Sequence, residues 1–186
     1  RPRLSEAILD FQAAAERLPP SEPQAIARFK LADCYFALTN HPAAISNYWI
    51  VSTNYSRVPS VKEGLAPHAL YQIVRAATAV GDLAAAELAI RQILRDYPEN
   101  YFGEPSLLSY GQALNRQGSP AAARELFAES IKRFPGSELV AEVELALLRT
   151  YTGERNWAAA VAEYDRWITN HLNHPRLPKA EFERAW

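Results

Sequence analysis

The sequence contains little cysteine and glycine and no methionine, and the first two shortages exclude particular kinds of site. With Cys34 as its one cysteine, the chain has neither an intrachain disulfide framework nor a multi-cysteine zinc site. The seven glycines are scattered singly, so there is no glycine-rich phosphate loop. There is no methionine and the chain begins Arg1-Pro2-Arg3, from which we expect a fragment of a longer protein.

Net charge and long apolar runs are lacking as well. Twenty basic residues oppose 21 acidic ones, a net charge of −1 that gives no long-range attraction for nucleic acid, and we expect no nucleic-acid partner. No apolar run reaches the roughly 18 residues that a membrane span requires, so we expect no membrane insertion by this chain. The hydrophobic content of 48% is ordinary for a globular protein and is enough to build a core.

Residues for catalysis or metal binding are sparse. The histidines are His41, His68, His171 and His174. The His171-x-x-His174 spacing could hold a metal, but no carboxylate or thiolate stands at a suitable distance in sequence, and the segment is more typical of a polar helix end. No serine or cysteine elbow accompanies the histidines. We therefore predict no enzyme activity, no metal and no cofactor.

What the chain does have is an internal repeat. An alanine recurs four residues before a large apolar residue, in Ala7/Phe11, Ala44/Tyr48, Ala86/Ile90, Ala123/Phe127 and Ala160/Tyr164. The successive alanines are 37, 42, 37 and 37 residues apart. A period in this range is typical of a stacked-repeat protein, which offers an extended surface rather than a deep catalytic cleft.

The segments around these alanines are predicted to form helix pairs. Apolar residues at three- and four-residue spacing predict first helices over 24–38, 67–80, 105–117 and 138–152. The marker alanines lie on the predicted second helices, over 42–55, 83–96, 120–133 and 157–170. Gly81 and Gly118 stand between the two helices of their pairs, where a tight turn needs a residue free to take positive φ.

These residues resemble the tetratricopeptide repeat. Gly111, Gly118, Ala123, Phe127 and Pro135 match its pattern most fully. Further copies are given by Leu31, Ala32, Tyr35, Ala44 and Tyr48, and by Leu147, Tyr151, Ala160 and Tyr164. The usual period is about 34 residues, so this is a longer variant. The resemblance implies an all-α, right-handed α-α superhelix, a solenoid of about four helix pairs preceded by a single N-terminal helix.

The register divides the chain, taken as one array over 1–186, into successive parts. These are a truncated repeat's second helix (1–20), repeats (24–56, 67–98, 104–135 and 138–172), an inserted loop (57–66) and the start of a further helix (176–186).

The repeat junctions suggest a narrower resemblance. Tyr97-Pro98-Glu99-Asn100 and Phe134-Pro135-Gly136-Ser137 are similar to junctions of bacterial envelope tetratricopeptide proteins, such as the outer-membrane assembly lipoproteins and the periplasmic partners of the Tol-Pal system. This resemblance implies the bacterial periplasm or cell envelope as the compartment, with the cytoplasm as the alternative.

The resemblance also implies which side chains line the concave groove, because first helices form that surface in tetratricopeptide arrays. The expected groove residues are Phe29, Asp33, Phe36, His68, Tyr71, Arg75, Thr78, Leu108, Gln112, Asn115, Arg116, Arg149 and Thr152. Arg75, Arg116 and Arg149 are predicted to share one face. They would grip an extended segment with acidic groups, or else pair with carboxylates of the chain itself, such as Asp33 and Glu142.

A second candidate patch lies on the opposite, convex side. Trp49 and Ile50 stand where the other repeats carry small, polar or charged residues. An exposed Trp-Ile pair would be a docking patch. Alternatively, the inserted loop folds back and covers Trp49 with Val58 and Val61.

The function that follows is non-catalytic binding of a protein or peptide partner by a scaffold or adaptor, in envelope assembly if the narrower resemblance holds. Two alternatives remain: a regulatory or substrate-holding arm of a larger enzyme, and a structural oligomerisation module. The sequence leaves the oligomeric state open.

Overall fold

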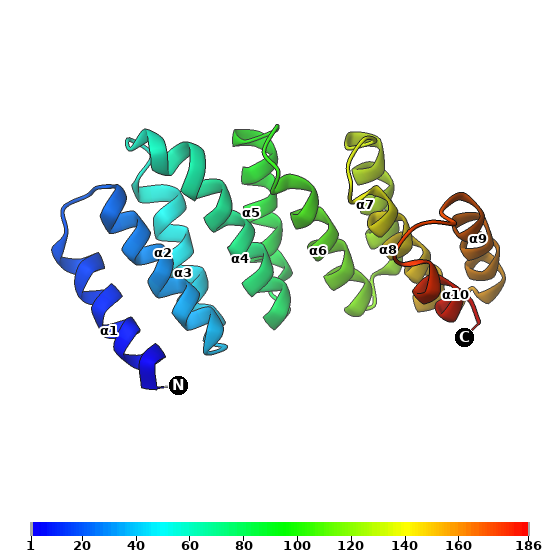
Figure 1. Cartoon of the computed structure of the whole chain (residues 1–186), viewed down its shortest axis with the longest axis horizontal. Helices are drawn as coiled ribbons and strands as arrows, with labels where there is room; N and C mark the ends of the chain where they lie inside the picture. Colours follow the sequence, from blue (N-terminus) through cyan, green and yellow to red (C-terminus); the bar gives the residue numbers. More distant parts are fainter. Residues whose placement is uncertain (1, 186) are drawn as a thin grey trace. The chain divides into compact units, whose positions relative to one another are not determined.

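The computed structural model describes the backbone of residues 2–185 and the side chains of residues 3–185, so residues 1 and 186 of the predicted ranges lie outside it. Throughout this part of the chain the regular structure is helical, without a strand. The elements are α1 (Pro2–Arg17), α2 (Glu22–Ala37), α3 (His41–Asn54), the π-helical turn η1 (Val61–Leu65), α4 (Ala66–Val80), α5 (Leu83–Asp96), α6 (Gly103–Arg116), α7 (Pro120–Arg133), α8 (Val140–Gly153), α9 (Trp157–Asn170) and α10 (Leu177–Ala185) (Figure 1).

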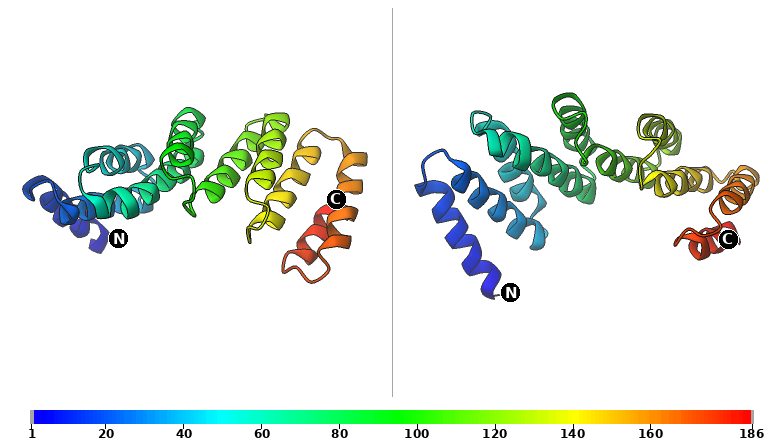
Figure 2. Two further views of the ribbon diagram at one scale, coloured as in Figure 1. Left: turned by 90° about the horizontal axis from the view of Figure 1, so that it is seen from above. Right: turned by 45° about the horizontal axis from the view of Figure 1, so that its top comes forward.

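The chain forms two compact units whose boundary falls within α6, between Ser106 and Leu107. In unit 1, consecutive helices from α1 to α5 pack against each other. In unit 2, the remainder of α6 contacts α7, and α7 to α10 pack in the same consecutive way. Short connections make neighbouring helices within each unit antiparallel (Figures 1 and 2). The predicted all-α fold of repeated helix pairs is confirmed, and the boundaries of α2 to α9 agree with prediction to within two residues, except at the inserted segment before α4.

The turns inside the helix pairs share one backbone conformation. Gly81 and Gly118 have φ of 78° and 81°, as their positions predict. The equivalent residues of the other two pairs are Thr39 and Arg155, which take positive φ of 59° and 58° although they carry side chains. Left-handed backbone is uncommon outside glycine. The repeat therefore imposes the turn geometry even where the residue disfavours it.

Polar side chains cap the second helices at equivalent positions. Asn40, Asp82 and Asn156 each accept a hydrogen bond from the backbone N–H three residues on, in α3, α5 and α9. Such caps stabilise a helix by about 1 kcal/mol. They fix where each second helix begins and hence the register of the alanine four residues later.

The marker residues of the four full repeats have equivalent environments. Each marker alanine is almost completely buried, and so is the large side chain four residues after it. Gly111 on α6 completes the third pair, because a Cβ there would lie 2.4 Å from Cε1 of Phe127. The α6 backbone thus approaches the Phe127 ring in a way that only glycine permits.

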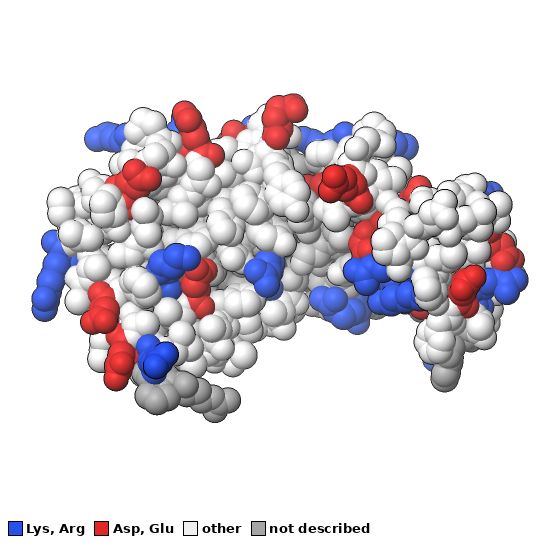
Figure 3. Space-filling model, viewed as in Figure 1, with Lys and Arg blue, Asp and Glu red and all other residues white. Residues whose placement is uncertain are grey.

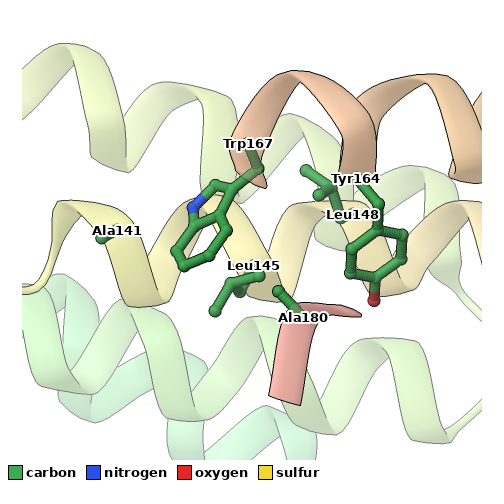
Figure 4. Close-up of a cluster of buried hydrophobic side chains, with 6 residues drawn as sticks. All are labelled: Ala141, Leu145, Leu148, Tyr164, Trp167 and Ala180. Carbon is green, nitrogen blue, oxygen red and sulfur yellow. The ribbon is translucent and has the colours of Figure 1, made fainter. Parts of the chain in front are cut away.

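The core of unit 2 extends over three successive helices. Ala141, Leu145 and Leu148 on α8 meet Tyr164 and Trp167 on α9 and Ala180 on α10. In Figure 4 the two aromatic side chains point from α9 toward α8. The last helix is therefore anchored to the unit by buried contacts.

The segment 57–66, expected as an inserted loop, is partly helical. Val61–Leu65 form a π-helical turn that leads directly into α4, with the Ala66 N–H bonded to the Val61 carbonyl. Val61 is buried, which ties the segment to unit 1. The extra residues of the 42-residue interval thus extend the first helix of this pair, because an apolar anchor at Val61 makes the helical path favourable.

Candidate partner-binding site

The first helices of unit 2 form a basic cleft. It has a volume of about 320 Å³ and is lined by Gln112, Asn115 and Arg116 of α6, Ala146 and Arg149 of α8, and Lys179 of α10. Figure 3 shows basic side chains gathered on the displayed face over this part of unit 2. Among the residues that the structure describes, three cations and no carboxylate line the cleft, so it favours an anionic ligand group.

A second cleft adjoins the first and is aromatic. Its volume is about 530 Å³, and its lining comprises Asn115, Arg149, Thr152, Gly153, Trp157, Tyr164, Phe182 and Glu183. Trp157 and Phe182 are 55% and 63% exposed, which is unusual for such large apolar side chains. Because Asn115 and Arg149 line both clefts, the basic and aromatic clefts are continuous at these two residues.

A carboxylate of α10 occupies the junction of the two clefts. The Glu183 Oε2 atom accepts hydrogen bonds from Arg149 Nε at 2.8 Å and from the Tyr164 hydroxyl at 2.9 Å. Its Oε1 atom lies 3.8 Å from Lys179 Nζ. Burial and the neighbouring Glu183 raise the pKa of the Tyr164 hydroxyl, which keeps it a donor to this carboxylate. Arg116 has no carboxylate partner among the described residues.

The approach of α6 to α8 is set by Asn115 and Gly153. The Asn115 Nδ2 group donates to the Arg149 carbonyl at 3.4 Å, while its Oδ1 atom is buried without a hydrogen-bond partner in the described part of the chain. A Cβ on Gly153 would lie 2.8 Å from that Oδ1 atom. Gly153 therefore makes room for the amide that stands at the junction of the clefts.

In unit 1, the predicted groove positions form an aromatic face around Arg75. The Arg75 guanidinium carbon lies 5.1 Å from the centre of the Phe36 ring and 5.9 Å from that of Tyr71. Its Nη1 donates to Gln72 Oε1 at 2.8 Å. Arg75 is thus held by ring faces and an amide, and among the described residues no carboxylate is hydrogen-bonded to it.

A stack of rings continues this aromatic face. The His68 ring lies parallel to Phe102 at 4.9 Å, and Tyr71 stacks on the same Phe102 at 5.1 Å. Burial lowers the pKa of His68, with Asp33 opposing this more weakly. Phe102 was not among the predicted groove residues, since it precedes the predicted first helix by three positions.

Asp33 has a structural role in the same unit. Its Oδ1 accepts from the Tyr48 hydroxyl at 2.7 Å, and Lys30 Nζ lies 3.1 Å from Oδ2. Burial, followed by the Asp33 hydrogen bond, raises the pKa of Tyr48. This tyrosine–carboxylate contact has a counterpart in Tyr164 and Glu183 of unit 2.

Two expected groove residues require correction. Phe29 is 2% exposed and packs edge-on against Tyr48, with ring centres 5.2 Å apart. Thr78 is 8% exposed and its hydroxyl donates to the Val74 carbonyl of its own helix. Both therefore belong to the core, because these positions of the first helix face the second helix.

The remaining predicted residues retain some exposure. Gln112, Asn115, Arg116, Arg149 and Thr152 line the two clefts of unit 2. Leu108 packs partly against the Phe127 cluster, which leaves it little free surface. Trp49 and Ile50 are half-buried rather than fully exposed. Whether any of these residues contacts a partner stays a prediction.

Several cleft residues were not predicted. Lys179, Phe182 and Glu183 lie on α10, which was expected only as the start of a further helix, and Trp157 lies at the beginning of a second helix. The available signal was the repeat register itself, because α10 continues the series of first helices α6 and α8. Arg149 pairs with Glu183 and not with Glu142, which was named as a possible partner for the predicted arginines; Glu142 instead pairs with Arg176 at 3.1 Å.

The histidine pair lies outside both clefts. The His171 ring stacks on Trp167 at 4.5 Å, and its Nε2 atom is 3.3 Å from Glu144 Oε2. Among the described residues, no three histidine, cysteine, aspartate or glutamate side chains are grouped as metal ligands would be. Nor does any helix in this part of the chain combine the length and apolar character needed to cross a membrane.

Comparison with known families agrees with the repeat architecture. Residues 71–138, from α4 to the segment before α8, match a family model described as Tetratricopeptide repeat. The match supports tetratricopeptide-type repeats in this part of the chain. Such repeats generally mediate protein–protein interactions and are typically non-catalytic. No curated protein gives a significant sequence match to the chain.

Proposed function

We propose that this chain is a non-catalytic adaptor whose unit 2 binds an extended segment of a partner protein. The ligand segment carries an acidic side chain for the basic cleft and a large apolar side chain for the aromatic cleft. The observation that supports this pairing is the sharing of Asn115 and Arg149 by both clefts.

The chemistry of the linings supports each half of the ligand. Arg116, Arg149 and Lys179 outnumber Glu183, so an added carboxylate meets a net positive charge. Trp157 and Phe182 offer rigid ring surface whose burial by an apolar side chain is favourable. In an extended chain, side chains two positions apart point to the same side. An acidic and an apolar residue separated by one residue would therefore reach adjoining clefts.

A peptide titration followed by NMR tests this function. The probe is a short glycine–serine peptide that carries one glutamate and one phenylalanine separated by a single serine. We expect it to shift the backbone resonances of α6, α8 and α10 in a saturable manner. Matched peptides have glutamine for the glutamate or serine for the phenylalanine, and each should bind more weakly. Absence of shifts at millimolar probe, or equal shifts with all three peptides, would contradict the proposal.

We propose bacterial envelope assembly as the process that this binding serves. The support is the Tyr97-Pro98 and Phe134-Pro135 junctions, which are similar to those of envelope tetratricopeptide proteins. Fractionation of cells that produce the full-length protein tests this, since the proposal requires the periplasmic or membrane fraction. Recovery in the cytoplasm alone would remove the envelope role and leave the binding function in place.

A further inference from the structure

The basic cleft of unit 2 is bordered by an acidic side chain from its own chain. Glu183 contacts two of the three cations that line it, Arg149 through a hydrogen bond and Lys179 at longer range. The Tyr164 hydroxyl binds the same Glu183 oxygen as Arg149 does. A carboxylate gripped by a guanidinium, an ammonium and a hydroxyl is coordinated as an anionic ligand would be.

The structure does not need this carboxylate in order to hold α10. Ala180 is completely buried in the α8–α9–α10 cluster, and Leu177 packs against the same cluster. One residue after Glu183, Arg184 forms an ion pair with Asp165 of α9. These contacts anchor the helix both before and after Glu183 in the sequence, so its side chain can leave Arg149 without α10 undocking.

From these contacts we infer that Glu183 is an internal ligand of the basic cleft, which a partner's carboxylate displaces from Arg149. The inference rests on the proposed function and adds regulation of the same site. Displacement exchanges one carboxylate for another at Arg149, so that contact alone contributes little net affinity. A partner that also contacts Arg116 and the exposed rings gains interactions that Glu183 does not make. An isolated carboxylate gains no such additional interactions. The internal ligand thus selects for partners with both features.

The substitution Glu183→Gln tests the inference. Glutamine keeps the size of the side chain and an oxygen that accepts from Arg149 and Tyr164, but it removes the competing charge. We expect the glutamate–phenylalanine peptide to bind this variant about ten-fold more tightly, because a unit charge this close to the ligand acts through little screening.

The matched control is Glu181→Gln. It changes the net charge equally on the same helix, but Glu181 is exposed and has no ion-pair partner among the described residues. We expect its affinity for the peptide to stay within about two-fold of the unmodified chain, since exposed charges away from the ligand are screened.

A second measurement uses the unmodified chain, so the inference can be tested even if the Glu183→Gln variant folds poorly. The Arg149 side-chain Nε–H resonance reports its bond to Glu183, and saturating peptide should shift it. Two results would overturn the inference: an Arg149 resonance that does not shift, or a folded Glu183→Gln variant that binds the peptide no more tightly than the Glu181→Gln control. In either case the proposed function would still stand as long as the peptide binds. Absence of peptide binding in every variant would overturn both.

Discussion

Replacing Phe127 with alanine is expected to lower the free energy of unfolding of unit 2 by about 3–5 kcal/mol, the usual cost of truncating a buried phenylalanine. Its ring is completely buried between the Gly111 region of α6 and the Val143 and Ala146 side chains of α8. Removing it leaves a cavity at the point where consecutive repeats interlock. Urea unfolding followed by circular dichroism measures the loss, and hydrogen exchange of α6, α7 and α8 amides assigns it to this unit.

The control for this truncation is Leu172→Ala, at an exposed position after α9, which should change stability by less than about 0.5 kcal/mol. Coupling with Gly111 gives a further check. Gly111→Ala places a methyl group against the Phe127 ring and should cost about 1–3 kcal/mol. Combined with Phe127→Leu, it should cost less than the two single changes together, because leucine lacks the ring atoms that clash. Strict additivity would show that these residues are not in contact.

The repeat was predictable from sequence because its signals are local. Helix periodicity, capping residues and the spacing of small and large apolar residues all act within one helix pair, so each copy repeats the same evidence. Thr39 and Arg155 show where such reasoning fails. Neither residue favours positive φ, and their conformation follows from the packing of the helices on either side rather than from their own preference.

The candidate site was less predictable because its decisive contacts join residues of different helices. The register placed Arg116 and Arg149 on first helices, and both line the basic cleft. It could not indicate that Arg149 is bonded to Glu183, 34 positions later, nor that Trp157 and Phe182 line the adjoining cleft. Phe29 and Thr78 were placed on the groove because a helix-face assignment is sensitive to small rotations, and a rotation of one position buries a side chain.

Reversing two charges of the basic cleft, with Arg116→Glu and Lys179→Glu together, is expected to weaken binding of the glutamate–phenylalanine peptide at least about 100-fold. Arg116 is exposed and has no carboxylate partner among the described residues. The Lys179 Nζ atom comes no closer than 3.8 Å to a Glu183 carboxylate oxygen, so this ion pair is a long one. The folded structure therefore loses little, whereas the cleft changes from net positive to net negative. Fluorescence anisotropy with a labelled peptide measures the affinity, and circular dichroism checks that helicity is unchanged.

The matched control places the same charge change on another surface, with Lys132→Glu and Arg133→Glu at the end of α7. Both of these residues are exposed and neither lines the clefts described for unit 2. If long-range charge alone governed binding, the two double variants would weaken it equally. If Arg116 and Lys179 contact the ligand, the control should retain most of the affinity and the loss in the cleft variant should persist at high salt, where remote charges are screened but short contacts are not. Equal losses in both variants would contradict a direct contact between the ligand and Arg116 or Lys179.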